Sequence, residues 1–411
     1  MRLGHGMALC ALALLVAGVV MVTSAGLELD AATPLTLEGI LLGRPALYAA
    51  LALGMLWLGS IVPVDRLYTL RGGLSPIPWL VIGMIVLLLA VHLPVIGKAE
   101  KGAHRWINLG LFTFQPSEFA KWALPIVVAW HCCRRAGTLH RLRDGFLPPI
   151  AIAAVVCGLI AVEDLGTAVL VFAVCVAMLV AAGCRLRYVA GLAAPALAGI
   201  GILIVTSPYR VNRILAYLDP FQEPAGRGYH VIQSIAAVAG GGISGRGIGN
   251  SVQKFGYLPE DTTDFIYAIV CEELGAAGAL MIIALYAILL LCGLGILRRA
   301  GTPFARLLGL GIILTIGLQA LMNLFVVTGL APTKGIALPL LSRGGSGWLL
   351  TAFSIGLMLS IDRDSAAAES EGEAEDAEDG MVDAIDEPVP RAETERDPSG
   401  LDPFAAEPGL R

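Results

Sequence analysis

The chain has 411 residues, of which 56% are hydrophobic and only 15% are charged, and its mean hydropathy is +0.77. This composition excludes a soluble globular domain, because the surface of such a domain must be largely polar. Crossing the hydrocarbon of a bilayer takes about 20 apolar residues per helix, so the chain has room for many crossings. We therefore expect an all-α, polytopic membrane protein.

Ten apolar runs are long enough to form membrane helices, since length distinguishes helices from strands in such runs. The alternative for the first run is a signal peptide, but its apolar stretch is long and we assign it as a spanning helix. We expect about ten transmembrane helices within residues 1–361, with a long extracytoplasmic loop at about 207–262. The runs lie near residues 7–26, 45–63, 78–97, 116–132, 146–162, 165–183, 187–206, 264–297, 304–330 and 345–361.

Arginine in the short loops predicts the orientation of these helices. Lys and Arg concentrate in the cytoplasmic loops of membrane proteins, and here arginines occupy alternate loops, near Arg2, Arg66, residues 134–143, Arg185 and Arg298. These loops are therefore expected in the cytoplasm. With ten crossings, both termini lie there as well.

The last fifty residues have a different composition from the rest. Of the 33 acidic and 28 basic residues, 17 and 4 lie from Asp362 onward, which leaves residues 1–361 with a net charge of +8. The acidic residues are accompanied by prolines and by few large apolar residues, a composition that remains disordered. We expect residues 362–411 to form a disordered acidic cytoplasmic tail, most simply a solvated spacer.

Cations also occur on the predicted outer side, against the usual distribution. Long loops cross the membrane whatever their charge, which accounts for the cations between Arg210 and Lys254 but not for those in the short loop around Arg105. A cationic outer surface suits an anionic ligand such as a diphosphate. The outer cations are Lys98, Lys101, Arg105, Arg210, Arg213, Arg227, Arg246, Lys254, Lys334 and Arg343.

One motif places an ion pair inside the predicted bundle. Glu118 and Lys121 belong to the segment Gln-Pro-Ser-Glu-Phe-Ala-Lys at residues 115–121. They are three residues apart, so they share one face of the helix that begins at Pro116. Charged pairs at membrane depth are candidate functional sites. The alternative is a pair that only neutralises itself between helices.

Two aspartates precede apolar runs on the outer side. Asp164 lies in Glu-Asp-Leu-Gly-Thr at residues 163–167, where its simplest role is to cap the following helix. Asp264 lies in Thr-Asp-Phe-Ile at residues 263–266 and is expected to open a membrane helix. A capping role is again the alternative for Asp264.

Two outer segments are rich in glycine and proline. The glycines between residues 240 and 249 would let the backbone approach a ligand closely, although such a run is weak evidence by itself. Residues 331–346 contain Lys334 among several helix-breaking residues, so they must line a cavity or lie at its rim. The sequence has no metal-binding spacing of histidines or cysteines and no Walker loop, so an ATP-driven pump is excluded.

In this order, the segments resemble the SEDS family (FtsW, RodA and SpoVE) over about residues 7–361. Residues 249–254 and 332–335 are most similar to the FtsW branch, whereas residues 229–234 fit RodA or SpoVE equally well. The resemblance implies an inverting peptidoglycan glycosyltransferase of the bacterial cytoplasmic (inner) membrane, which polymerises lipid II, an undecaprenyl-diphosphate-linked disaccharide-peptide, during cell division or cell-wall growth. The implied partners are a class B penicillin-binding protein and other division or elongation proteins, and no nucleic acid is expected.

The resemblance also implies roles for individual residues, with Asp264 required for polymerisation. Its carboxylate would act as general base or orienter of the acceptor hydroxyl, whereas the departing diphosphate needs cations. A divalent cation, Mg or Mn, is implied to assist, although the sequence contains no dedicated metal site. The expected substrate-binding residues are Arg105, Gln115, Glu118, Lys121, Arg210, Arg213, Lys254 and Lys334.

The sequence departs from the family pattern at Glu163, Cys271, Arg343 and Gly347, where proline, glycine, tyrosine and serine are usual. Two other functions stay open. A transporter that flips lipid II predicts access from both sides, whereas the polar motifs here cluster on the outer side. A non-catalytic division scaffold is disfavoured because the whole motif around Asp264 is retained.

Overall fold

The computed structural model describes residues 2–26, 37–70, 75–94, 96–100, 103–108, 110 and 113–386. The chain divides into two compact units, Met1–Ala366 and Ala367–Arg411. The helices are α1 Leu3–Ala25, α2 Leu37–Leu41, α3 Arg44–Ile61, α4 Val64–Thr69, α5 Pro76–Ala90, α6 Pro116–Arg134, α7 Leu147–Glu163, α8 Leu165–Ala181, α9 Leu186–Val205, α10 Pro208–Leu218, α11 Tyr229–Gly240, α12 Ile266–Arg299, α13 Pro303–Val327 and α14 Gly345–Asp386.

Each of the ten apolar runs coincides with a helix, which confirms the predicted all-α membrane class. Within the described ranges, seven helical segments are long and apolar enough to cross a membrane: α1, α3, residues 142–163, α9, α12, α13 and residues 345–370. Helices α5 and α8 are apolar but shorter. The remaining run, residues 116–132, forms α6, whose first turns carry Glu118 and Lys121. The count of ten spanning helices is therefore approximate.

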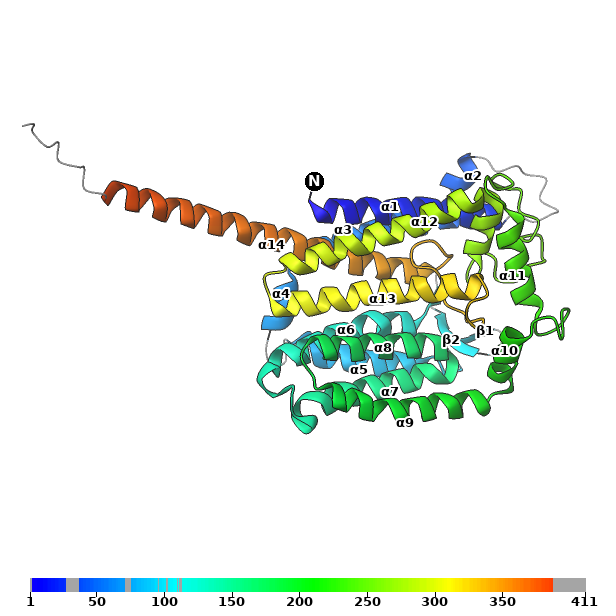
Figure 1. Cartoon of the computed structure of the whole chain (residues 1–411), viewed down its shortest axis with the longest axis horizontal. Helices are drawn as coiled ribbons and strands as arrows, with labels where there is room; N and C mark the ends of the chain where they lie inside the picture. Colours follow the sequence, from blue (N-terminus) through cyan, green and yellow to red (C-terminus); the bar gives the residue numbers. More distant parts are fainter. Residues whose placement is uncertain are drawn as a thin grey trace, which may run out of the picture. The chain divides into compact units, whose positions relative to one another are not determined.

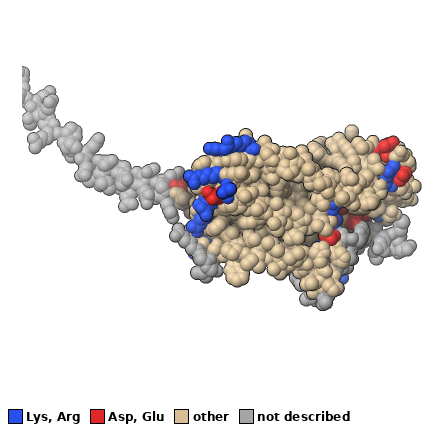
Figure 2. Space-filling view, turned by 90° about the horizontal axis from the view of Figure 1, so that it is seen from below, with Lys and Arg blue, Asp and Glu red and all other residues tan. Residues whose placement is uncertain are grey.

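The distribution of charge fits a membrane-embedded bundle. Figure 2 shows charged side chains gathered towards the two ends of the bundle, with a broad uncharged belt between them. Large apolar side chains lie exposed on the helices of this belt, among them Leu197, Ile202, Leu280 and Leu291. Exposed apolar surface of this extent is stable in lipid but not in water.

Helices α1, α12, α13, α6 and α8 run side by side through the membrane unit (Figure 1). Their starts are set by local sequence: Thr302 caps α13 by accepting a 3.2 Å hydrogen bond from the amide of Ala305, and Pro303 follows at the first helical position. A small antiparallel sheet connects α5 to α6, with strands β1 Gly97–Glu100, β2 Ala103–Asn108 and β3 Thr113–Phe114.

The predicted outer loop at 207–262 contains two helices, α10 and α11, and then packs on a break in α12. Gly275 inside α12 has φ 66° and ψ −163°, so the helix loses its regular hydrogen bonds there. The loop supplies replacements: the amides of Arg246 and Gly247 donate to the carbonyls of Glu272 and Glu273 at 3.0 and 2.9 Å. A Cβ on Gly245 would lie 2.2 Å from the Glu273 carbonyl oxygen. Gly245 therefore lets the loop backbone pack against α12.

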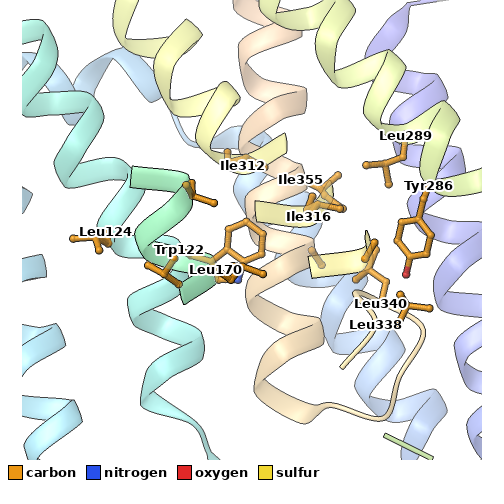
Figure 3. Close-up of a cluster of buried hydrophobic side chains, with 14 of the residues drawn as sticks. Trp122, Leu124, Leu170, Tyr286, Leu289, Ile312, Ile316, Leu338, Leu340 and Ile355 are labelled. Atoms are coloured by element: carbon orange, nitrogen blue, oxygen red, sulfur yellow. The ribbon is translucent and has the colours of Figure 1, made fainter. Parts of the chain in front are cut away.

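The segment between α13 and α14 turns back into the bundle. Figure 3 shows Leu338 and Leu340 lying among Tyr286 of α12 and Ile355 of α14. The hydroxyl of Tyr286 donates to the carbonyl of Pro339, which satisfies one polar group of a non-helical backbone. Irregular backbone at this depth is stable only when protein surrounds it. This segment therefore belongs to the core.

The acidic tail begins as a continuation of α14, which extends to Asp386. The sequence analysis predicted disorder from residue 362 onward. Ala and Glu, which have high helix propensity, are frequent after Ser365, and this explains the continued helix. Residues 387–411 lie outside the described residues.

Candidate functional site

The candidate site lies at the end of the bundle that is predicted to face outward, where β2, α7, α8, the start of α12 and the α13–α14 segment meet. Asp264 belongs to a turn, and α12 begins two residues later at Ile266 with Phe265 as its N-cap. The helix expected to open at Asp264 thus begins two residues later, and the N-cap position, which was the alternative for Asp264, belongs to Phe265. The turn is set by Glu260, which has φ 60° and whose carbonyl accepts the amides of Thr263 and Phe265, each at 3.1 Å.

Gly335 brings Asp264 and Arg105 to one place. A Cβ built on Gly335 would lie 3.2 Å from Oδ2 of Asp264 and 3.7 Å from Nη1 of Arg105. A carboxylate and a guanidinium from segments more than 150 residues apart in the sequence thus face the same small space. A side chain at position 335 would crowd the Asp264 carboxylate in that space.

Arg105 is held in place by the end of α7. Its Nε and Nη2 both donate to the carbonyl of Glu163, at 3.1 and 2.5 Å, and the amide of His104 donates to Oε2 of Glu163 at 2.8 Å. These residues line a small pocket of about 20 Å³. Glu163, which departs from the family pattern, thus anchors the strand that carries Arg105.

Lys334 lies beside the start of α8. Burial lowers the pKa of Lys334, and the nearby charge of Asp164 partly offsets that effect. Asp164 caps α8, because its Oδ1 accepts the amide of Thr167 at 3.1 Å and its Oδ2 accepts the hydroxyl of Thr167 at 3.0 Å. The predicted capping role of Asp164 is confirmed. Arg105, Asp264 and Lys334 thus belong to one region of the structure.

The Glu118–Lys121 pair lies within the bundle below this region. The Nζ of Lys121 is 2.6 Å from Oε2 of Glu118, and it donates a 2.8 Å bond to Oε1 of Gln319. The Lys121 side chain is only 2% exposed. Nε2 of Gln319 then donates to the carbonyl of Ala337 at 2.7 Å. The pair therefore supports the α13–α14 segment rather than presenting its charges at the outer surface.

A second amide on α13 ties Asp264 to the same segment. Nδ2 of Asn323 donates to the carbonyl of Asp264 at 2.8 Å and to the carbonyl of Ile336 at 2.7 Å. Gln319 and Asn323 lie four residues apart on one face of α13. Neither residue was predicted from the sequence as part of the site. Two amide side chains at this spacing in an otherwise apolar run were the signal that could have found them.

Lys254 has a structural role, which corrects its predicted role in binding substrate. Its side chain is fully buried and donates to the carbonyls of Ser24 and Gly249, at 3.1 and 2.7 Å, and to Oε1 of Glu273 at 3.2 Å. These three acceptors match the three protons of its ammonium group. Glu272 accepts the hydroxyl of Ser251 at 2.5 Å beside them. The outer loop is thereby locked to α1 and α12.

The two predicted loop arginines also bind backbone. Arg210 donates to the carbonyls of Leu203, Ala161 and Val162 at 2.7 to 2.9 Å, so it joins the ends of α7 and α9 instead of facing a ligand. Arg213 donates to the carbonyl of Thr333 at 3.0 Å and lies over the ring of Tyr209. It positions the residue next to Lys334.

The remaining predicted residue, Gln115, lies half-buried at the start of α6. Its side-chain Nε2 donates to Oγ of Ser117 at 3.1 Å, and its backbone N–H donates to Oγ of Ser346 at 3.3 Å. The departures at Arg343 and Gly347 lie nearby: the amide of Arg343 donates to the carbonyl of Thr262 at 2.8 Å, and a Cβ on Gly347 would lie 3.4 Å from Oε2 of Glu118.

One further carboxyl group lies near Asp264 and was not predicted. Burial raises the pKa of Asp261 to about 6, although the amide of Thr262 and the charge of Lys254 oppose the rise. The described residues contain no group of three or more His, Cys, Asp or Glu that could hold a metal ion. Because Mg²⁺ is often held by one or two carboxylates together with substrate phosphates, the implied divalent cation stays a prediction.

Comparison with known proteins places the chain in a family. The family model for FtsW, RodA and SpoVE, described as cell cycle protein, matches residues 5–367. The chain belongs to the FtsW/RodA/SpoVE family. This confirms the family that the sequence motifs indicated.

Relatives in this family match over most of the chain. A probable peptidoglycan glycosyltransferase FtsW from Geobacter sp. (strain M18) is 41% identical over 345 residues, which is 84% of this chain and 92% of the relative. Stage V sporulation protein E of Bacillus subtilis is 39% identical over 67% of this chain and 76% of its own length. Both matches agree with the predicted family branches.

Solved structures of family members share the fold. A chain from a peptidoglycan synthase complex that coordinates polymerisation and crosslinking is 28% identical and superposes with a TM-score of 0.69, covering 88% of this chain and 97% of that one. RodA of Thermus thermophilus is 24% identical, with a TM-score of 0.61 and coverage of 88% and 96%. At that identity, the likeness to RodA supports the fold alone.

Proposed function

We propose that this chain is an inverting peptidoglycan glycosyltransferase, which polymerises lipid II at the outer face of the cytoplasmic membrane. The observation that carries the proposal is the convergence of the Asp264 carboxylate and the Arg105 guanidinium at Gly335. A base beside a cation, at the outer end of a membrane bundle, suits transfer from a lipid diphosphate to a sugar hydroxyl. The FtsW relatives carry the name of this activity.

In the proposed reaction, the acceptor hydroxyl attacks the anomeric carbon of the donor sugar. The carboxylate of Asp264 accepts the hydroxyl proton, a new carbon–oxygen bond forms, and the bond to the diphosphate oxygen breaks with inversion. The diphosphate leaves as an anion, which Arg105 and Lys334 stabilise. Because burial lowers the pKa of Lys334, an arriving diphosphate would favour its protonated form. Glu118, Lys121 and Asn323 hold the segment that carries Gly335.

The test compares Asp264→Asn with Asp219→Asn, an exposed aspartate at the end of α10. Each purified variant is assayed for polymerisation of lipid II at equal amounts of folded protein. General-base catalysis contributes about 10²–10⁴-fold, so Asp264→Asn should lose that factor, whereas Asp219→Asn should keep the wild-type rate. Polymerisation by Asp264→Asn at the wild-type rate would show that the assigned base is wrong. A wild-type protein that moves lipid II between leaflets without polymerising it would instead indicate a transporter.

We further propose that the chain acts beside a class B penicillin-binding protein that crosslinks the new strands. Its similarity to a chain of a peptidoglycan synthase complex supports this partner. The proposed orientation has both termini in the cytoplasm, which the alternating arginine-rich loops support. Reporter fusions should place residues 134–145 inside and residues 215–255 outside. A cytoplasmic location for residues 215–255 would contradict both the orientation and the role of Asp264.

A further inference from the structure

A second pocket opens at the opposite end of the bundle from Asp264, among the end of α4, the start of α5, the end of α6 and the turn before α7. Its volume is about 630 Å³. The arginine distribution predicts that this end is cytoplasmic. None of the proposed chemistry uses it.

Buried hydrogen-bond donors without partners cluster in this pocket. The described part of the chain contains seven buried side-chain polar atoms without a hydrogen-bond partner, and three of them belong to residues lining the pocket: Oγ of Ser75, Nε1 of Trp130 and Nε of Arg134. All three can donate a hydrogen bond. Native proteins leave few buried donors unpaired, so this cluster indicates a missing acceptor.

The charge of the pocket indicates that the acceptor is an anion. Arg134, Arg135 and Arg143 line it, with Asp144 as the opposing carboxylate. The guanidinium of Arg134 is fixed before any ligand binds, because it donates to the carbonyl of Tyr68 at 3.2 Å and lies 5.1 Å from the centre of the Tyr68 ring. An arginine in a fixed orientation loses little entropy on binding an anion.

The start of α5 adds a second attraction for an anion. Ser75 is the N-cap residue of this 15-residue helix, yet its hydroxyl makes no capping hydrogen bond and its side chain is 6% exposed. Pro76 and Pro78 in the first turn of α5 have no backbone N–H, so this helix end offers an anion few amide donors. The attraction at this point therefore comes from the unused buried hydroxyl of Ser75.

Apolar residues beside the cations identify the anion as amphiphilic. Leu70, which lines the pocket, is 39% exposed, and Leu142 and Leu147 lie exposed next to the arginine-bearing turn. Such residues offer acyl chains a surface, whereas a free anion would gain nothing from them. We propose that this pocket binds the phosphodiester headgroup of an anionic membrane lipid, with the acyl chains against these leucines.

The experiment measures lipid binding to the full-length protein, and its readout does not involve polymerisation. Phosphatidylglycerol is titrated into the purified chain in neutral detergent and its affinity is compared with that of zwitterionic phosphatidylethanolamine. The test variant is Arg135→Gln/Arg143→Gln. The matched control is Arg298→Gln/Arg299→Gln, which removes the same charge from exposed positions at the end of α12.

Each arginine near a lipid headgroup contributes about fivefold to binding, so the test variant should bind phosphatidylglycerol about 25-fold more weakly. The control should bind phosphatidylglycerol much as the wild type does, because Arg298 and Arg299 do not line the pocket, and the affinity for phosphatidylethanolamine, whose headgroup has no net charge, should stay nearly unchanged. Ser75→Ala, which keeps the charge, should also weaken phosphatidylglycerol binding. Equal loss in test and control variants would overturn the proposal, since only diffuse charge would then matter. Inorganic phosphate is titrated in a parallel arm. An affinity for phosphate equal to that for phosphatidylglycerol would assign the pocket to a free anion and overturn the proposed lipid ligand.

Discussion

The buried pair of Glu118 and Lys121 offers a quantitative test of the bundle. Lys121 is 2% exposed and has two acceptors, the Glu118 carboxylate at 2.6 Å and the Gln319 amide oxygen at 2.8 Å. Glu118→Ala removes the only one of these that carries charge and leaves a buried ammonium group beside a neutral amide. Breaking a buried pair in this way costs about 3–5 kcal/mol. We expect that loss in the free energy of unfolding, measured in mixed micelles, and a lower folded yield.

The structure supplies a matched control in an exposed ion pair of the outer loop. Glu223 and Arg227 lie 3.4 Å apart, but the Glu223 side chain is 55% exposed, so Glu223→Ala should cost at most about 1 kcal/mol. The double variant Glu118→Gln/Lys121→Met removes both buried charges and should recover much of the loss, because no charge is then left unpaired. If Glu118→Ala lowers the free energy of unfolding no more than Glu223→Ala does, the ammonium group of Lys121 is not buried in the bundle.

Two further perturbations test the loop on α12 and the unpredicted carboxyl group. Gly245→Ala should strongly reduce the folded yield, because its Cβ would lie 2.2 Å from the Glu273 carbonyl oxygen. The control Gly199→Ala in α9 has open space around the new methyl group, so its thermal stability should be equal to that of the wild type or higher. Equal folded yields of the two variants would contradict the packing of the loop on α12. For Asp261, an unfolded carboxyl loses its proton near pH 3.8 and the folded one near pH 6, so the wild type loses stability as the pH rises through this window. Asp261→Asn lacks this loss, so its melting temperature should rise relative to the wild type between those pH values, and a constant difference would refute the raised pKa.

The sequence was sufficient for the membrane class and for the identity of the motifs. Apolar runs of membrane-spanning length leave the chain no stable alternative to helices in lipid, and each run forms one. Short-range roles followed as well: Glu118 and Lys121 are three residues apart, and Asp164 begins a helix, so helix geometry alone predicted their contacts.

Composition alone leaves two interpretations of the chain after Asp362. Net charge and few large apolar residues predict disorder, whereas alanine and glutamate have high helix propensity and follow an established helix, α14. The disordered acidic tail stays a prediction.

Tertiary structure decided which cations lie near Asp264. Arg105 and Lys254 look alike in the sequence, as basic residues on the predicted outer side, yet one shares the space at Gly335 and the other is sealed against Glu273. Their positions depend on how β2, α1 and the broken α12 pack, and these contacts join residues up to 249 positions apart. Local sequence determines helices because their hydrogen bonds are local, whereas the environment of a charge is determined by whichever distant segments surround it.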